Sequence, residues 1–292
     1  MSTPLQAALW MIGAIVNFSA LAVAGRELAH ALDTFELMLW RSLIGMGLMT
    51  AVILAGRRVE AFVPRRPGLH LLRNLFHFAG QNLWYFAIFT VPLAQVFALE
   101  FSSPIWAALG AALFLHERLG ARRLGAILLG FLGILIVVRP GLDTLSPGTL
   151  AAAGAAIGFA GSALVTRVLT RSNGALAILF WMTTMQAGLA LLFAGADLDI
   201  ALPAGRDWLW VSVIAAGGLL AHYCFTRALA LAPASVVMPL DFARLPLIAI
   251  IGMVLYGEPL DPFVFVGAAL IFAGNHVNIT LASRAERAAS RP

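Results

Sequence analysis

The sequence has no lysine, and charged residues of any kind are scarce. All 19 basic residues are arginine, and charged residues make up 11% of the 292 positions, against 61% that are hydrophobic. So few charges leave too little polar surface to cover a globule in water, which excludes an ordinary water-soluble protein. Cysteine is limited to Cys224, so no internal disulfide and no cysteine-based metal site are expected. The composition therefore predicts a protein embedded in a lipid bilayer.

Long polar stretches are also missing. The longest are the segment from Gly56 to Pro67 and the tail after Ala282, and neither can fold as a catalytic or nucleotide-binding domain. Within the apolar segments, His222 with Ser235 or Cys224 forms no recognisable set of nucleophile, base and orienting group. We therefore expect no enzyme and no cofactor, and any driving force must be a gradient. The start MSTPLQAALW lacks a basic leading region, so the first apolar run is expected to remain as a membrane helix.

Ten apolar stretches have the length needed to cross about 30 Å of hydrocarbon as a helix, roughly 20 residues at 1.5 Å per residue. Helices are predicted rather than barrel strands, because the runs are unbroken and do not alternate apolar with polar residues. The predicted spans are Leu5 to Ala24, Phe35 to Ala55, Leu69 to Val91, Ala94 to Leu115, Gly120 to Val138, Gly148 to Val168, Ala175 to Ala196, Trp208 to Leu231, Ala234 to Tyr256 and Pro262 to Ala282. The predicted fold class is an all-α integral membrane protein with ten transmembrane helices.

The sequence matches itself when it is shifted by 141 positions. The pairs that coincide include Trp40 on Trp181, Pro92 on Pro233, Phe101 on Phe242, Glu117 on Glu258 and Gly133 on Gly274. Such a register indicates two copies of one structural unit, residues 1–141 and residues 142–292. Each copy has five spans. Since an odd number of spans reverses direction, the second copy enters the membrane from the opposite side, and the copies are predicted to form an inverted repeat.

Arginines gather on one side of this predicted topology. The loops and tail of that side hold Arg57, Arg58, Arg65, Arg66, Arg118, Arg122, Arg123, Arg167, Arg171, Arg284, Arg287 and Arg291. The opposite side has Arg26, Arg139 and Arg206. By the positive-inside rule the arginine-rich side is cytoplasmic, so both termini are predicted inside the cell. The positive charge is interpreted as contact with the membrane surface, and no nucleic-acid partner is expected.

Two acidic residues, Glu100 and Asp241, lie within predicted spans and coincide in the 141-residue register. A charge at membrane depth costs at least about 2.5 to 3.5 kcal/mol, so such a residue usually faces a cavity or a partner. Each carboxylate is about seven residues into its span, which places the two on opposite sides of the midplane, each about 5 Å from it. One interpretation is proton coupling or substrate contact. The other is a permanent ion pair, for which Arg244, three residues after Asp241, is the candidate.

Basic residues within the spans form a second candidate group. Arg73 and Arg227 lie near span ends, where their side chains can reach the membrane surface. Arg41 is deeper, and its repeat partner is the uncharged Met182. It either contacts substrate or braces a carboxylate such as Glu100. A surplus of arginine over carboxylate would favour a substrate that bears a carboxylate or phosphate.

The third span is the most polar, and its polar residues share one helical face. Spacings of three and four residues align His70, Arg73 or Asn74, His77, Gln81 and Trp84, with Tyr85 next to them. The corresponding stretch of the second copy carries His222, Tyr223 and Arg227. The stripe on the third span is predicted to border water or substrate. His70 and His77 are two turns apart with no third ligand suggested nearby, so no metal site is expected.

Aromatic rings inside the spans are another candidate lining. They are Trp84, Tyr85, Phe101, Trp106, Trp181, Tyr223 and Phe242. Such rings either stack on a planar substrate or pack the helices together.

Small residues and prolines predict how the helices pack and bend. The sixth span has a face of small residues: Ala151, Gly154, Ala155, Gly158 and Gly161. The fifth span has a shorter face of this kind, Gly130 with Gly133. Five prolines border or interrupt the fourth and ninth spans: Pro92, Pro104, Pro233, Pro239 and Pro246. A proline removes a backbone hydrogen bond, so these residues either kink helices that move or simply bend and terminate packed ones.

The end of each copy resembles a known family. HERLGARRLGAILLGFLGILIVVRPG, from His116 to Gly141, and its echo GEPLDPFVFVGAALIFAGNHVN, from Gly257 to Asn278, resemble the paired signature of the drug/metabolite transporter superfamily, EamA type. Arg41 in LMLWRSLIG resembles that family's second-helix arginine. The resemblance implies a monomeric inner-membrane carrier of small metabolites with a central cavity. Members include exporters of amino acids and importers of riboflavin or S-adenosylmethionine.

The leading hypothesis is a secondary transporter in the cell inner membrane that moves a small, planar or carboxylate-bearing metabolite by rocking of the two copies. Protons are the candidate coupling ion. The predicted substrate or coupling residues are Arg41, His77, Gln81, Trp84, Tyr85, Glu100, Trp106, Trp181, His222, Tyr223, Asp241 and Arg244. The alternatives are a drug/metabolite efflux pump of broad specificity, a channel and a membrane enzyme.

Overall fold

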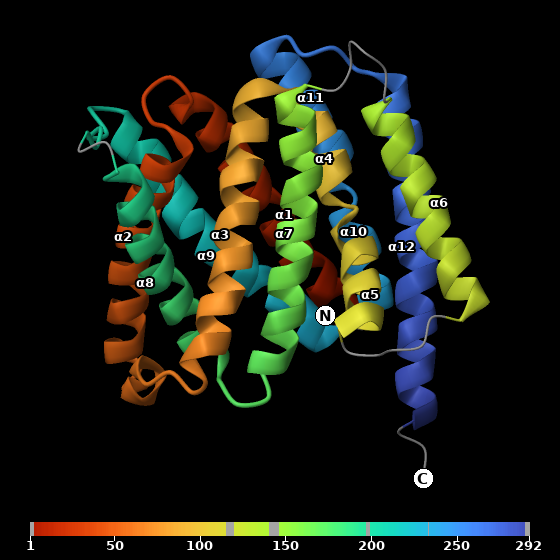
Figure 1. Cartoon of the computed structure of the whole chain (residues 1–292), viewed down its shortest axis with the longest axis horizontal. Helices are drawn as coiled ribbons and strands as arrows, with labels where there is room; N and C mark the ends of the chain where they lie inside the picture. The colour runs from red at the N-terminus through yellow and green to blue at the C-terminus, as the bar shows by residue number, and fades with distance from the viewer. Residues whose placement is uncertain (1–2, 115–119, 140–145, 197–198, 233, 290–292) are drawn as a thin grey trace.

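The computed structural model describes residues 3–114, 120–139, 146–196, 199–232 and 234–289, which form helices and their connections (Figure 1). The predicted Glu117 and Pro233 lie outside these residues. The helices are α1 (Thr3–Leu28), α2 (Thr34–Ala55), the short 3-10 helix η1 (Val59–Phe62), α3 (Pro67–Thr90), α4 (Leu93–Glu100), α5 (Ser103–Phe114), α6 (Ala121–Val138), α7 (Pro147–Leu169), α8 (Ala175–Ala194), α9 (Asp207–Leu231), α10 (Ala234–Asp241), α11 (Arg244–Tyr256) and α12 (Pro262–Ala289). The all-α fold predicted from the sequence is confirmed.

Most helices are long and apolar enough to cross a membrane. Eight helical segments of the described chain meet that condition by length and composition, and α11 is a shorter apolar helix. Large apolar side chains such as Leu113, Leu192 and Val254, each 68% exposed, cover the outside of the bundle. The third predicted span, α3, is more polar, and it buries its polar side chains inside the bundle. The molecule is a multi-pass membrane protein of ten spans.

The fourth and ninth spans are each divided in two. The fourth consists of α4 and α5, and the ninth of α10 and α11. The predicted residues Glu100 and Asp241 end the first half-helix of each span, so the two divisions fall at matching positions of the 141-residue register. Prolines stand just beyond both divisions, Pro104 as the second residue of α5 and Pro246 as the third residue of α11. A proline there lacks the N–H that a continuous helix would need.

A side chain from another helix satisfies the backbone at the first division. The amide N–H of Ile105 bonds to the carbonyl of Ser102 rather than to that of Phe101. The freed Phe101 carbonyl accepts a hydrogen bond of 2.6 Å from Asn275 Nδ2 on α12. In lipid every backbone polar group needs a partner within the protein, so this contact stabilises the division.

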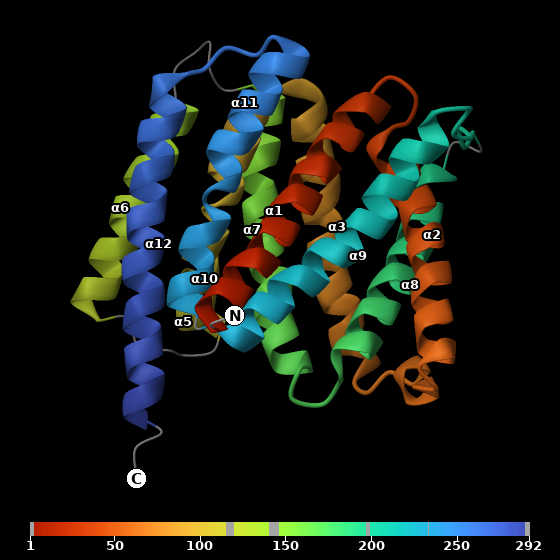
Figure 2. The same cartoon turned by 180° about the vertical axis from the view of Figure 1, so that it is seen from behind.

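The two copies interlock through helix pairs that follow the inverted repeat. Helix α1 packs most extensively against α9, and α3 against α7, two pairs that exchange under the repeat. The pairs α2 with α8 and α6 with α12 each join equivalent helices, at opposite edges of the bundle (Figures 1 and 2). The predicted small-residue face of α7 packs as expected, since a Cβ added to Gly158 would lie 2.7 Å from the Cα of Gly80 on α3.

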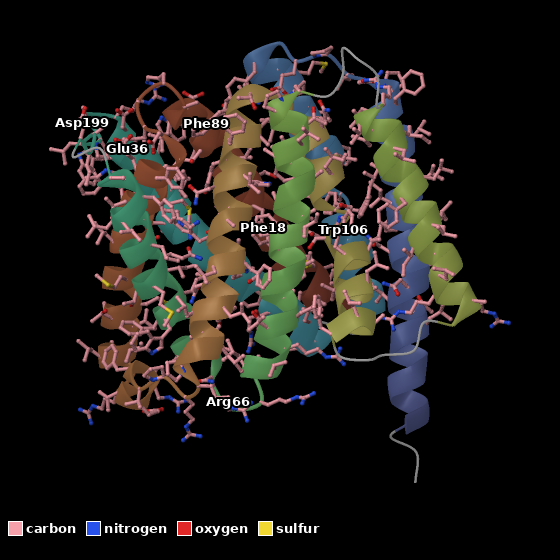
Figure 3. The ribbon with its side chains drawn as sticks, in the orientation of Figure 1. Phe18, Glu36, Arg66, Phe89, Trp106 and Asp199 are labelled. Atoms are coloured by element: carbon pink, nitrogen blue, oxygen red, sulfur yellow. The ribbon has the colours of Figure 1, made fainter. Side chains whose placement is uncertain are left out.

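The arginine-rich connections that the structure describes lie at one end of the bundle. Figure 3 shows Arg66 at the lower end, and Glu36 and Asp199 at the upper end. The α2–α3 and α7–α8 connections and the last described turn of α12 also lie at the lower end, and α1 starts in the lower half of the view (Figure 1). At the upper end Asp33 caps α2, and Glu36 accepts a hydrogen bond of 2.6 Å from the amide of Ala201. A cytoplasmic lower end remains a prediction of the sequence.

Candidate functional site

The two divided helices meet at one guanidinium. Arg244, the first residue of α11, places Nη2 3.2 Å from Glu100 Oε1 and 3.0 Å from Asp241 Oδ2. Trp84 on α3 donates a hydrogen bond of 2.7 Å from Nε1 to Glu100 Oε2. All four residues are buried or nearly so, with the Arg244 side chain 5% exposed. We call Glu100, Asp241 and Arg244 the central bridge.

The central bridge corrects the predicted positions of the two carboxylates. They were expected on opposite sides of the midplane, each about 5 Å from it. Instead both lie beside the same nitrogen of Arg244, because both half-helices end where the two divided spans cross. The ion-pair interpretation therefore describes the geometry. Arg244, which was expected to serve Asp241, also reaches Glu100.

Aromatic rings surround the central bridge. The guanidinium carbon of Arg244 lies 4.8 Å from the ring centroid of Phe18, and 5.0 Å from those of Phe97 and Phe101. The matched residues Phe101 and Phe242 stack with centroids 4.3 Å apart. A cation that is held by ring faces and carboxylates in a dry environment interacts strongly with both. The bridge nevertheless has two carboxylates for one guanidinium, and Asp241 Oδ1 has no hydrogen-bond partner among the described residues.

A second polar cluster joins the two copies. Arg41 on α2 donates a hydrogen bond of 3.1 Å from Nη2 to Gln186 Oε1 on α8. Gln186 Nε2 lies 2.7 Å from His77 Nδ1 on α3. Gln186 is fully buried, and Arg41 and His77 are each 7% exposed. We call Arg41, Gln186 and His77 the amide cluster.

The partners in the amide cluster determine its proton positions. Arginine has donors only, so the atom of Gln186 that faces Arg41 is the amide oxygen. The amide nitrogen then faces His77 and donates to Nδ1. Imidazole that accepts at Nδ1 carries its proton on Nε2, so His77 retains an Nε2–H donor.

The predicted stripe on α3 lies inside the bundle beside the amide cluster. The fully buried hydroxyl of Tyr85 interacts with the side chain of Arg41. Gln81 Oε1 is also buried, makes no hydrogen bond of ordinary geometry among the described residues, and lies one helical turn from the ring of His77, which interacts with it. Buried polar atoms are usually paired, so unpaired ones at one place indicate a ligand or water. His77, Gln81 and Tyr85 lie together inside the bundle, and their contact with water or substrate stays a prediction.

Arg73 corrects one expectation of the sequence. It was expected to extend to the membrane surface, but it is 6% exposed. Its side chain donates hydrogen bonds to Thr166 Oγ1 at 3.3 Å and to Asn74 Oδ1 at 3.0 Å. Because the nearby helix ends pack against each other, Arg73 finds partners inside the bundle. Arg73 therefore adds a second buried positive charge near the amide cluster.

The remaining predicted residues divide between the interior and the outer face. His222 lies edge-on to Phe18 with centroids 5.5 Å apart. Trp106 contacts Phe131 on α6, and it lies level with Phe18 in Figure 3. Trp181 packs against Phe180, and its Nε1 has no hydrogen-bond partner among the described residues.

Tyr223 lies away from this interior site. It is 53% exposed and contacts Trp10. Arg227 lies over the ring of Trp10 on the same exposed face, as its predicted snorkelling implies. Of the predicted residues of α9, only His222 faces the interior.

An ion pair that the sequence analysis did not place in the site lies at the upper end. Arg26 on α1 binds Glu258 Oε1 at 2.9 Å and donates a hydrogen bond of 2.7 Å to the carbonyl of Val91. Glu258 Oε2 accepts a hydrogen bond of 2.8 Å from the amide of Leu93, at the start of α4. We call Arg26 and Glu258 the upper ion pair. The coincidence of Glu258 with Glu117 in the repeat was the signal that could have identified it.

Possible metal ligands and surface hollows also bear on the chemistry of the site. No group of three His, Cys, Asp or Glu side chains among the described residues could hold a metal ion. Two surface hollows lie at opposite ends, one of about 480 Å³ beside the α1–α2 connection and one of about 380 Å³ beside the α2–α3 and α7–α8 connections. The arrangement offers buried charges and hydrogen-bonding groups at the interface of two copies.

Comparison with known proteins agrees with this architecture. The model of the EamA-like transporter family matches the chain twice, at residues 5–139 and 146–280. The chain belongs to the EamA-like transporter family. The two matches begin 141 residues apart and end 141 residues apart, the same offset as the repeat in the sequence.

Relatives in this family are transporters of small molecules. A protein of Vibrio cholerae named riboflavin transporter is 32% identical over 92% of this chain and 91% of its own length. A protein of Rickettsia felis named S-adenosylmethionine uptake transporter is 24% identical over 90% of this chain and 88% of its own length. A solved crystal structure, 23% identical, matches the fold with a TM-score of 0.62 over 96% of this chain and 98% of that chain. The protein is a small-metabolite transporter and not an enzyme.

Proposed function

We propose that this protein carries riboflavin across the cell inner membrane by alternating access, as a monomer with both termini in the cytoplasm. The observation that supports riboflavin as the substrate is the 32% identity to the riboflavin transporter of Vibrio cholerae over nearly the full length of both chains. The orientation rests on the arginine-rich lower end.

The charge of the buried arginines favours riboflavin over S-adenosylmethionine as the substrate. S-adenosylmethionine carries a sulfonium, an ammonium and one carboxylate, so its net charge is positive, whereas riboflavin is neutral with two ring carbonyls. Arg41 and Arg73 are buried beside the amide cluster and bind neutral oxygens rather than carboxylates within the described residues. Buried positive charge of this kind repels a cationic solute and attracts carbonyl oxygens.

The inverted repeat supplies a route for alternating access. Inverted repeats of this kind commonly move as two bodies about a site near the midplane, with divided helices beside the site. The divided helices α4/α5 and α10/α11 meet at the central bridge, and the upper ion pair lies at one end. The central bridge, with two carboxylates for one guanidinium, is the proposed place for a coupling proton.

Uptake into proteoliposomes tests the proposal. Purified protein is reconstituted and loaded with unlabelled riboflavin, and exchange with external radiolabelled riboflavin is measured. We expect saturable counterflow that unlabelled riboflavin inhibits and S-adenosylmethionine does not. Counterflow of S-adenosylmethionine without counterflow of riboflavin would show that riboflavin is not the substrate. Non-saturable flux would indicate a channel.

A further inference from the structure

Buried polar side chains of α3 form a row next to the amide cluster. His77 and Gln81 are one helical turn apart, so their side chains extend from the same face of α3. His77 has an Nε2–H donor, because its Nδ1 accepts from Gln186. Gln81 Oε1 is a buried acceptor that makes no hydrogen bond of ordinary geometry within the described residues, and the ring of His77 lies beside it.

Further donors lie beside this pair. The Tyr85 hydroxyl, one turn beyond Gln81, is fully buried and interacts with the side chain of Arg41. Arg41 has N–H groups besides the one that binds Gln186, and it lies near that hydroxyl. The site therefore offers one acceptor, Gln81 Oε1, between donors on both sides along the helix.

The edge of the flavin ring has the complementary order of groups. Its pyrimidine portion presents a carbonyl, an imide N–H and a second carbonyl. We infer that Gln81 Oε1 accepts the imide N–H of the transported ring, while His77 Nε2–H and the Arg41 guanidinium face its carbonyls. The inference rests on the proposed function and assigns the recognition of the ring to this row of side chains.

The amide cluster explains how these donors remain in place. Gln186 comes from the second copy, and it holds Arg41 and His77 of the first copy through one amide. Neither donor can turn without breaking a buried hydrogen bond, which is costly in a dry interior. Gln186 is a positioning residue, whereas Gln81, His77 and Arg41 contact the solute.

A comparison of two ligands isolates the imide contact. Riboflavin and 3-methylriboflavin differ only in that the imide N–H carries a methyl group in the second. Binding of each to the purified full-length protein in nanodiscs is measured from the quenching of flavin fluorescence. We expect the wild-type protein to bind 3-methylriboflavin about 10-fold more weakly, as for the loss of one buried hydrogen bond.

The variant Gln81→Leu removes the acceptor and keeps a similar volume. We expect it to bind riboflavin about 10-fold more weakly than wild type and to bind the two ligands with nearly equal affinity. The matched control is Gln95→Leu, because Gln95 on α4 binds Thr149 outside this site. Its preference for riboflavin over 3-methylriboflavin should equal that of wild type. If Gln81→Leu does not yield a monodisperse protein, Gln81→Met provides the same comparison.

Each outcome bears on a separate claim. A 10-fold preference that persists in the Gln81 variant, or no preference in wild type, overturns the imide contact while riboflavin binding itself stands. Absence of riboflavin binding by the wild-type protein overturns the proposed function and this inference with it.

Discussion

Single side chains connect the two copies of this transporter. Arg41 of the first copy binds Gln186 of the second, and both are buried between helices α2 and α8. An arginine in such a place contributes geometry as well as charge, because its planar guanidinium holds several hydrogen-bond donors in fixed directions. Arg41 can therefore bind Gln186 with one N–H and offer the others to a solute.

The change Arg41→Lys tests this use of geometry. Lysine keeps the charge but has no planar set of donors, so it cannot bind Gln186 and a carbonyl in the same way. We expect the dissociation constant for riboflavin to rise about 10-fold, measured by fluorescence quenching. The matched control is Arg227→Lys, since Arg227 lies on the exposed face over Trp10. Equal losses in both variants, or none in either, would contradict a role of the Arg41 guanidinium in binding.

The sequence predicted some of these residues because polar groups are rare in apolar spans. Arg41, His77 and Gln81 stood out for that reason. The neighbours His222 and Tyr223 could not both face the interior, since successive residues of a helix are about 100° apart. Gln186 was missed because it is a neutral amide whose repeat partner is Gly45, and only the tertiary structure brings it to Arg41.

At the scale of the helices, the two divided spans hold the three residues of the central bridge. The sequence placed prolines at both, but it could not place the divisions themselves. Their positions depend on partners from elsewhere in the chain: Asn275 of α12 binds the freed carbonyl of Phe101, and Arg244 binds Glu100. Local periodicity contains no information on such contacts, so the central bridge was predicted only in part.

Asn275→Leu tests the contact at the first division. The substitution leaves the Phe101 carbonyl buried without a partner, which costs about 1–3 kcal/mol. We expect a lower melting temperature of the detergent-solubilised protein, measured by a thiol-independent unfolding assay such as intrinsic tryptophan fluorescence. Asn17→Leu is the control, because Asn17 binds the carbonyl of Gly13 within its own helix. A melting temperature unchanged in Asn275→Leu would show that the contact does not stabilise the division.

Glu100→Gln and Asp241→Asn test the central bridge as the place of a coupling proton. Each change removes one carboxylate that can take up a proton and leaves one to pair with Arg244. We expect accumulation of riboflavin driven by a pH gradient to be abolished in at least one variant, while counterflow without a gradient continues. The control is Glu60→Gln, an exposed residue paired with Arg58 in the α2–α3 connection. Gradient-driven accumulation that is unchanged in both bridge variants would show that the coupling proton does not bind at the central bridge.

At the scale of the whole molecule, the repeat predicts that the two ends of the bundle close alternately. The upper ion pair lies at the upper end, where it links α1 to the connection before α12 and to the start of α4. Its side chains are largely buried, 20% exposed for Arg26 and 10% for Glu258. A partly buried ion pair with added backbone hydrogen bonds can hold two bodies together, and its loss leaves a charge without its partner.

Arg26→Gln is therefore expected to shift the protein toward a conformation open at the upper end. Access is measured with a cysteine at Ile88, a fully buried position one turn deeper than the Val91 contact, in a Cys224→Ser background. We expect a membrane-impermeant thiol reagent to label this cysteine several-fold faster in Arg26→Gln, because a population shift of about 1.4 kcal/mol changes the open fraction 10-fold. Riboflavin transport is expected to slow, since the closed state becomes rarer.

The exposed pair of Arg139 and Asp261, where α6 ends and α12 begins, provides the control for this experiment. It joins an arginine to a carboxylate at the same end of the bundle, but both side chains are more exposed, and surface pairs contribute little. Arg139→Gln is therefore expected to leave labelling at position 88 unchanged. Equal rates in the Arg26 and Arg139 variants would mean that the upper ion pair does not hold the two copies closed, and that packing between α1 and α9 closes this end instead.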